Sequence, residues 1–176
     1  YSKLIVMTPA IYQIKNACLA IEATKILSET FPVTEAHVRT GLEAKPLPCR
    51  LERHGNIVID GAHNPEAEDI MMQSITMISE SRPIHVVFAS YRDKNIAVEL
   101  PRIGRDAAEI VLTTFDSKRA RDEMDYFLYA ADYSYNEDYK GAIKELLEKY
   151  PNDLILITGS LAFAGIARTF VTKELG

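Results

Sequence analysis

From residue 49 to the end of the chain, short apolar runs alternate with helical stretches. The apolar runs are predicted strands at 57–60, 84–89, 110–114 and 154–158, with a weaker one at 132–134. Helical patterns lie between and after them at 65–79, 96–104, 123–130, 139–149 and 161–174. Strands that are apolar throughout and alternate with helices form mostly parallel sheets covered on both faces. We therefore predict an α/β fold with helices on both faces of a mostly parallel sheet.

The residues before this alternation have a different pattern. Leu4 to Met7 is an apolar run that predicts a short strand, and apolar residues at helical spacing predict one long helix from Ile11 to about Ser28. A shorter helix is expected over 34–41, and the prolines between Glu43 and Pro48 are typical of an extended linker. We place a domain boundary between Pro32 and Pro48.

Composition narrows the class of protein. With 176 residues, 47% of them apolar, the chain can bury one good core and leave a small appendage. A net charge of -5 argues against a nucleic-acid binder, because phosphate backbones are bound by an excess of Lys and Arg. No apolar run approaches the roughly 18 residues of a membrane helix. The two cysteines lack metal-ligand spacing, which is ordinary for a reducing compartment. We expect a cytoplasmic protein with a small-molecule site and no membrane partner.

The stretch Asp60-Gly61-Ala62-His63-Asn64-Pro65 stands where a predicted strand ends and a helix begins. Gly61 permits a turn conformation that other residues resist, Asn64 is a natural helix cap, and Pro65 fits the first helical position. The turn holds a carboxylate and an imidazole beside free helix N–H groups, which favour a phosphate or a substrate carboxylate. A purely structural role for Asp60 and His63 in stiffening the turn is equally open from position alone.

Polar residues also follow other predicted strands, at the edge of the sheet where ligands collect. Ser160, in Thr158-Gly159-Ser160, either caps the last helix, which position alone favours, or binds a ligand oxygen. The charged stretch 90–95 is typical of a solvated loop. Lys118, Arg119 and Arg121 form a basic cluster that either attracts an anionic substrate or begins a solvated helix.

Several common nucleotide-binding and hydrolase motifs are absent from the sequence. The phosphate loop GxxxxGK[ST] does not occur, and neither does the dinucleotide fingerprint GxGxxG. There is no GxSxG elbow and no HExxH helix, so neither serine-hydrolase nor zincin chemistry is indicated. By itself, the chain lacks the usual cradle for a nucleoside triphosphate.

Several short motifs in a fixed order resemble one family, the folylpolyglutamate synthase and dihydrofolate synthase group of the Mur ligase superfamily. They are Tyr12-Gln13 with Asn16-Ala17, Pro48-Cys49-Arg50-Leu51-Glu52, Asp60-Gly61-Ala62-His63-Asn64-Pro65, Asp93-Lys94-Asn95, Arg119-Ala120 and Thr158-Gly159-Ser160-Leu161. The resemblance spans nearly the whole chain but only the C-terminal part of such an enzyme. It implies that residues 1–31 are the closing strand and helix of a central ATPase domain, 32–48 a linker, and 49–176 a Rossmann-like, glutamate-binding C-terminal domain.

The resemblance also implies a reaction. In this family a folate carboxylate is phosphorylated by ATP, and the amine of L-glutamate attacks the acyl phosphate. The expected ligands are ATP, Mg²⁺, L-glutamate and a folate substrate, with the metal ligands mostly on the missing N-terminal ATPase domain, which is the partner this chain would need. The fragment alone is expected to be inactive, and dihydrofolate synthase activity of the full-length enzyme is left open.

Five residues receive roles from the matching motifs. Asn16 is expected against the adenine, Arg50 at the ATP phosphates, and Asp60 at the nucleotide, through its ribose. His63 and Ser160 would shape the phosphate and glutamate end of the site. Arg50 and His63 are therefore the candidate catalytic residues, and no metal ligand is assigned. The physical interpretation agrees, because an arginine suits charge that develops on a transferred phosphoryl group.

The sequence departs from the family pattern at three positions. Cys49 replaces the Gly that often precedes the arginine, Tyr12 replaces a His, and Asn95 replaces the second acid of an Asp-Lys-Asp motif. The first change bears on how Arg50 approaches its ligand, and the last bears on any charge or metal role of that loop. An alternative hypothesis is a free-standing Rossmann-like module that binds a nucleotide or an acidic metabolite without catalysis.

Overall fold

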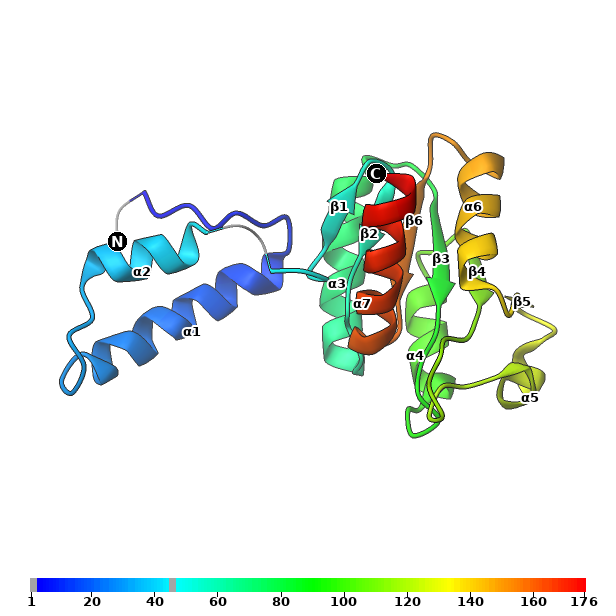
Figure 1. Cartoon of the computed structure of the whole chain (residues 1–176), viewed down its shortest axis with the longest axis horizontal. Helices are drawn as coiled ribbons and strands as arrows, with labels where there is room; N and C mark the ends of the chain where they lie inside the picture. The colour runs from blue at the N-terminus through cyan, green and yellow to red at the C-terminus, as the bar shows by residue number, and fades with distance from the viewer. Residues whose placement is uncertain (1–2, 45–46) are drawn as a thin grey trace. The chain divides into compact units, whose positions relative to one another are not determined.

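The computed structural model describes residues 3–44 and 47–176, which belong to two units, Tyr1–Leu47 and Pro48–Gly176. The larger unit is built on a six-stranded sheet with the strand order β1-β2-β6-β3-β4-β5 (Figure 1). The strands are β1 (Glu52–His54), β2 (Ile57–Ile59), β3 (Ile84–Phe88), β4 (Glu109–Leu112), β5 (Ser134–Tyr135) and β6 (Leu154–Thr158). All neighbours pair in parallel except β1 and β2. The predicted, mostly parallel sheet is confirmed.

Strand β1 is the one strand of this sheet that the apolar pattern does not predict. Its residues, Glu52 to His54, are polar, and it pairs with β2 in an antiparallel hairpin through the two-residue turn Gly55-Asn56. Gly55 has a φ of 59°, which suits such a turn. In the sequence, the turn indicates this hairpin, because three polar residues show no alternating apolar pattern.

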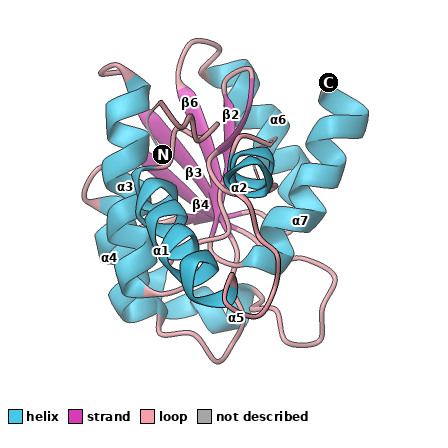
Figure 2. Cartoon of the chain, turned by 90° about the vertical axis from the view of Figure 1, so that its left-hand side faces the viewer, coloured by secondary structure: helices cyan, strands magenta, loops and turns pink. Residues whose placement is uncertain are grey.

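Helices cover both faces of the sheet, as predicted. Figure 2 shows the sheet between α3 (Pro65–Ser79) and α4 (Ile96–Gly104) on one side and α6 (Tyr139–Lys149) and α7 (Leu161–Phe170) on the other. The short α5 (Glu123–Tyr126) continues as a 3₁₀ turn, Phe127–Tyr129, and α7 continues as a π-helical turn, Val171–Leu175. Because both faces are covered, β3 and β6 are buried along their whole length.

The last strand lies in the middle of the sheet. β6 is inserted between β2 and β3, so three segments far apart in the sequence end side by side. Asp60 donates its N–H to the carbonyl of Ile157 at 3.0 Å, and Ala89 donates to the carbonyl of Thr158 at 3.2 Å. The polar residues that follow β2, β3 and β6 therefore gather at one edge of the sheet, which is where ligands bind in α/β proteins. We call it the carboxyl edge.

The smaller unit contains the two expected helices, α1 (Ile11–Leu27) and α2 (Glu35–Leu42). The strand predicted from Leu4 to Met7 is wrong, because these residues have irregular backbone. A strand needs a hydrogen-bonded partner, and residues 3–44 and 47 contain no second strand. Of the expected linker 32–48, residues up to 47 group with this unit, and residues 45 and 46 lie outside the described residues.

A helix that crosses a bilayer must be both long and apolar. Across 3–44 and 47–176, no helix combines sufficient length with a sufficiently apolar sequence.

Gly159, directly after β6, is where the carboxyl edge is packed most tightly. Its φ is 111°, and an added Cβ would lie 2.6 Å from the Ala89 carbonyl oxygen and 2.8 Å from the Phe88 ring. We expect Gly159→Ala to lower the free energy of unfolding by about 3 kcal/mol or more, because backbone strain and overpacking combine. Gly55→Ala is the matched control: its φ is also positive but no atom lies within 4 Å. It should cost only about 1 kcal/mol. Equal losses in urea titrations would contradict the packing argument.

Candidate functional site

The Asp60 carboxylate lies inside the protein at the end of β2. The residue is 1% exposed. Its Oδ2 accepts the N–H of Leu51 at 2.9 Å, and its Oδ1 accepts the N–H of Ala62 at 2.8 Å. The side chain that the sequence assigns to a nucleotide ribose therefore joins two segments of its own chain, the loop before β1 and the turn after β2. That loop carries Arg50.

Arg50 is flanked by two residues with left-handed backbone conformations. Cys49 has a φ of 55° and Leu51 a φ of 48°, which is strained for residues other than glycine. Cys49 donates its N–H to Glu52 Oε2 at 3.0 Å and accepts the Gly61 N–H at 2.9 Å. Arg50 is half-buried, and across 3–44 and 47–176 no hydrogen bond or ion pair engages its guanidinium. The fold thus fixes the Arg50 backbone and leaves its side chain available to a ligand.

Glu52 is the second carboxylate that holds this loop, and nothing in the sequence singles it out beyond its place in the motif. Besides the Cys49 N–H, it accepts the Arg168 Nε–H at 2.7 Å on Oε2 and contacts His54 Nε2 at 3.0 Å on Oε1. Burial opposes ionisation, but the hydrogen bonds from Arg168, Cys49 and His54 outweigh it and lower the pKa of Glu52. The carboxylate is therefore charged at neutral pH.

His63 and Asn64 lead into α3. Asn64 caps the helix as predicted, because its side chain accepts the Ala67 N–H at 2.9 Å. His63 Nδ1 lies 3.0 Å from the carbonyl oxygen of Gly61. A carbonyl can only accept, so in this contact Nδ1 carries the hydrogen, and Nε2 is the ring nitrogen that faces away from the turn carbonyl. The half-buried imidazole is thus oriented by its own turn.

Gly61 and Ser160 also lie at the carboxyl edge, and the expected conformational role of Gly61 is wrong. Gly61 does not have a positive φ, so its role is not conformational freedom. A Cβ at position 61 would lie 2.6 Å from Leu161 Cδ1 and 3.1 Å from Leu161 Cα. Glycine is therefore needed there because Leu161 leaves no room for a side chain. Ser160 is 2% exposed, and its Oγ accepts the Phe163 N–H at 3.0 Å. It caps α7, as position alone favours.

Two glutamates are buried where α3 and α4 begin. Glu68 is 1% exposed and Glu99 3%, each in the first turn of its helix. Within the described part of the chain, both carboxylate oxygens of Glu68 lack a hydrogen-bond partner, and so does the Oε2 of Glu99. Burial, and then the charge of Glu99, raise the pKa of Glu68 to about 7; burial also raises the pKa of Glu99. The sequence pattern does not reveal this pair.

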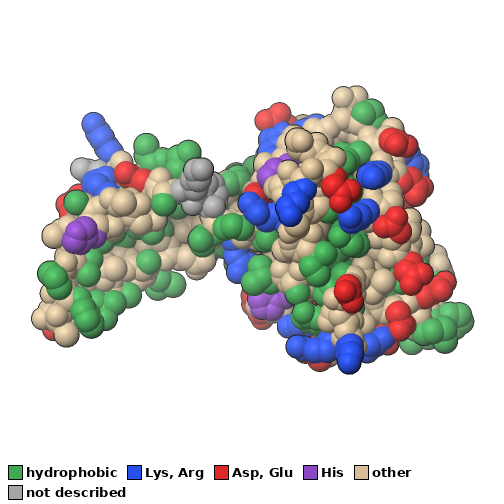
Figure 3. All heavy atoms as spheres, viewed as in Figure 1, with side chains coloured by type: hydrophobic (Ala, Val, Ile, Leu, Met, Phe, Trp, Pro, Cys, Tyr) green, Lys and Arg blue, Asp and Glu red, His purple; other side chains and the backbone are tan. Residues whose placement is uncertain are grey.

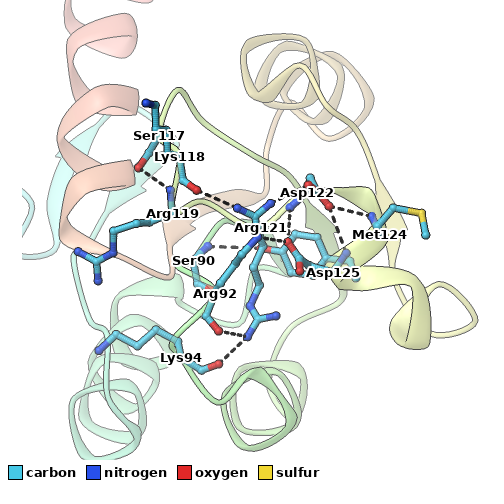
Figure 4. Close-up of polar contacts among 11 residues, drawn as sticks. Ser90, Arg92, Lys94, Ser117, Lys118, Arg119, Arg121, Asp122, Met124 and Asp125 are labelled. Atoms are coloured by element: carbon cyan, nitrogen blue, oxygen red, sulfur yellow. Dashed lines mark hydrogen bonds and ion pairs between the residues drawn. The ribbon is translucent and has the colours of Figure 1, made fainter.

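Arginines tie together the loops that follow β3 and β4. Arg92 reaches across to Asp122 and Asp125, each at 2.7 Å, while Arg121 donates to the backbone carbonyls of Arg92 and Lys94 (Figure 4). Arg119 pairs with Asp93 at 3.1 Å and lies over the Tyr91 ring.

Two members of the predicted basic cluster, Arg119 and Arg121, are thus engaged within the protein. Lys94 and Arg119 nevertheless extend away from this network in Figure 4. Figure 3 shows Lys and Arg side chains gathered along the lower end of the larger unit, where Figure 1 has these loops. Basic side chains are therefore exposed at this end of the larger unit, where they are available to an anionic ligand.

Asn16 belongs to the smaller unit and lines a cavity of about 300 Å³ there. The wall of the cavity is mostly apolar, with Gln13, Asn16 and Thr8 as its polar members. The Asn16 amide donates to Gln13 Oε1 at 2.9 Å. A flat, largely apolar group with a few polar atoms would fit such a wall.

The described residues do not supply a metal site of their own. No group of three or more His, Cys, Asp and Glu side chains within 3–44 and 47–176 is arranged to hold an ion. Mg²⁺ prefers octahedral oxygen coordination. The described residues therefore supply no complete ligand set for Mg²⁺ by themselves.

Comparison with known proteins identifies the domain. Residues 49–161 match the family model of the Mur ligase glutamate ligase domain. The chain is 30% identical to a folylpolyglutamate synthase of Lacticaseibacillus casei, covering 89% of this chain and 38% of that protein. It is 32% identical to a dihydrofolate synthase/folylpolyglutamate synthase of Bacillus subtilis, with 86% and 37% coverage. The Mycobacterium tuberculosis folylpolyglutamate synthase, solved with ADP and AMPPCP, superimposes with a TM-score of 0.85 at 26% identity, over 99% of this chain and 43% of that one.

Cys49 offers a test of strain beside Arg50. At most positions Gly is less stable than Ala by about 1 kcal/mol, because it loses more backbone freedom on folding. With its φ of 55°, position 49 should reverse this order. We expect Cys49→Gly to be at least as stable as Cys49→Ala in urea unfolding, although both lose the buried thiol. A clear advantage for Ala would show that the loop is relaxed.

The buried glutamates predict a pH dependence of stability. The folded chain binds a proton at Glu68 up to pH about 7, whereas its ordinary pKa is 4.5, so the free energy of unfolding should fall as pH rises between these values. Glu68→Gln should make this fall shallower and stabilise the chain at pH 7.5. Glu66→Gln, an exposed residue of the same helix, is the control. Urea titrations from pH 4.5 to 7.5 measure the slopes, and an unchanged slope in Glu68→Gln would refute the assignment.

Proposed function

Because the chain belongs to the Mur ligase family through its glutamate ligase domain, residues 49–161, we propose that it is the C-terminal part of an ATP-dependent ligase that adds L-glutamate to folate. The relatives named above support a folylpolyglutamate synthase, with dihydrofolate synthase activity in addition as in the Bacillus subtilis relative. The chain spans 38% and 37% of these two proteins, so activity requires the rest of the enzyme. Residues 1–31 are proposed to be the end of the central ATPase domain, and 49–176 the C-terminal domain.

The observation that carries the proposal is the pinned loop beside the DGAHNP turn. The buried Asp60, the half-buried Glu52 and a turn N–H hold the backbone around Arg50, while its guanidinium has no partner in the described residues. A guanidinium without a protein partner, held on a fixed backbone, suits a phosphoryl group whose negative charge increases in the transition state. We propose that Arg50 contacts the ATP phosphates.

The other motif residues divide by position. His63, with Nε2 available, and the capped N-terminus of α7 at Ser160 lie on the carboxyl edge, and we propose that they shape the phosphate and glutamate end. Asn16, in the cavity of the smaller unit, is proposed to contact the adenine. For Asp60, the two backbone hydrogen bonds support a role in holding the Arg50 loop beside any contact to the ribose.

The proposed reaction needs no nucleophile from this chain. ATP phosphorylates a folate carboxylate, and the glutamate amine displaces the phosphate to form an amide. The contribution of these residues is to orient the reactants and to stabilise negative charge. Mg²⁺ would be held mostly by the part of the enzyme outside this chain. The proposed location is the cytoplasm.

Arg50 is tested in the full-length enzyme. Arg50→Ala should lower kcat/KM for ATP by about 100-fold, and Arg50→Lys by less, because a single ammonium replaces a planar fork. Arg53→Ala is the matched control, since Arg53 is an exposed neighbour that donates only to the Gly55 carbonyl. Steady-state ligation assays measure the ratio, and urea unfolding checks that stability is unchanged. Activity equal to that of Arg53→Ala would remove Arg50 from the site.

The isolated chain gives the complementary test. We expect the 176-residue chain to show no ATP-dependent ligation, and His63→Ala to lower ligation by the full-length enzyme about 100-fold. Robust turnover by the chain alone would contradict the proposal. Micromolar ATP binding to the chain without turnover would favour the free-standing binding module instead.

A further inference from the structure

Arg168 and Glu52 form an ion pair between α7 and the Arg50 loop. They are 116 residues apart in the sequence, and the Arg168 Nε–H lies 2.7 and 2.9 Å from the two oxygens of Glu52. Arg168 stands in the last turn of α7, where a cation also suits the helix dipole. The Glu52 side chain is 16% exposed and the Arg168 side chain 37%, so the acid is the more buried partner.

Glu52 also accepts a hydrogen bond from the backbone next to Arg50. Its Oε2 accepts both the Arg168 Nε–H and, at 3.0 Å, the N–H of Cys49. Cys49 has a left-handed φ of 55°, a conformation that persists only where its surroundings hold it. Without Arg168, the carboxylate that accepts the Cys49 N–H would keep only its contact with His54 among the side chains of the described residues.

The other contacts of the loop do not replace this one. Asp60 holds the N–H of Leu51, on the far side of Arg50, and the Gly61 N–H holds the Cys49 carbonyl. His54 touches Glu52 through Oε1, the oxygen that does not accept from Cys49. Through Glu52, the Arg168 contact links α7, which Ser160 caps at its start, to the residue preceding Arg50.

We propose that Arg168 and Glu52 are positioning residues that hold Arg50 in its binding geometry. The contact ties the last turn of α7 to the Arg50 loop, and Ser160 caps the start of the same helix. This inference rests on the proposed function only for the role of Arg50 towards ATP. The positioning of the loop itself is independent of it and is tested separately.

The first experiment measures amide hydrogen exchange in the 176-residue chain by NMR. In Arg168→Met and in Glu52→Gln, the Cys49 amide should exchange at least about tenfold faster, which corresponds to a typical net hydrogen bond. The Ala62 amide, held by Asp60, and the amides of β6 should not change. Arg168→Lys should retain part of the protection, and it serves if Arg168→Met does not fold.

The matched control is Glu174→Gln, which removes the more exposed ion pair of Glu174 with Lys140 at the same end of α7. It should leave exchange at Cys49 unchanged. Cys49 exchange that is equally slow in Arg168→Met and in the parent chain would overturn the proposal. So would a uniform increase at Cys49, Ala62 and β6, because this indicates general destabilisation.

The second experiment is a double-mutant cycle in the full-length enzyme. If Arg168 acts through Arg50, Arg168→Met should lower kcat/KM for ATP about tenfold when Arg50 is present and less than about twofold in the Arg50→Ala background. Equal effects in both backgrounds would overturn the coupling. If Arg50→Ala itself has no effect, the proposed function of Arg50 fails, while the exchange result still decides whether Arg168 positions the loop.

Discussion

The buried carboxylate of Asp60 is the interaction on which the carboxyl edge depends. An ionised group removed from water is costly unless hydrogen bonds replace its hydration. Here the replacement comes from the N–H groups of Leu51 and Ala62, on two segments that the hydrogen bond from the Gly61 N–H to the Cys49 carbonyl also joins. The acid therefore fixes the loop before β1 against the turn after β2. Arg50, His63 and the start of α3 all take their positions from this junction.

The topology explains why the junction lies beside the start of α7. β6 is the last strand along the sequence, yet it lies between β2 and β3 in the sheet. Its end brings Gly159 against Ala89 and Phe88, and the first residue of α7, Leu161, against Gly61. Two helix N-termini, capped by Asn64 and Ser160, thus begin at one edge. Their N–H groups and the nearby basic side chains make this edge favourable for anions.

The sequence predicts the parts of this arrangement that depend on local patterns. Apolar runs and caps place the parallel strands and helices well, because burial on two faces and helix capping leave a signature within a few residues. Strand β1 and the false strand at 4–7 show the limit, since pairing depends on a partner that periodicity does not identify. The motif residues are likewise visible, but the direction of the Asp60 carboxylate is not. Glu52 and Arg168 meet across 116 residues, and the pairing of Glu68 with Glu99 requires knowing that α3 packs on α4.

Several features that disagree with local rules lie in the Arg50 loop and at the starts of α3 and α4. Cys49 and Leu51 have strained backbone, each at a cost of about 1–3 kcal/mol. Glu68 and Glu99 are buried acids with unpartnered oxygens in the described structure. Elsewhere in the sheet, β3 and β6 are wholly buried, and His85 of β3 is a polar residue among their mostly apolar side chains. A fold that concentrates unfavourable terms in one place must hold that place with several contacts at once, and Asp60, Glu52 and the Gly61 N–H do so around Arg50. Relaxing the loop would stabilise the chain and, by the same act, release the arginine from its geometry.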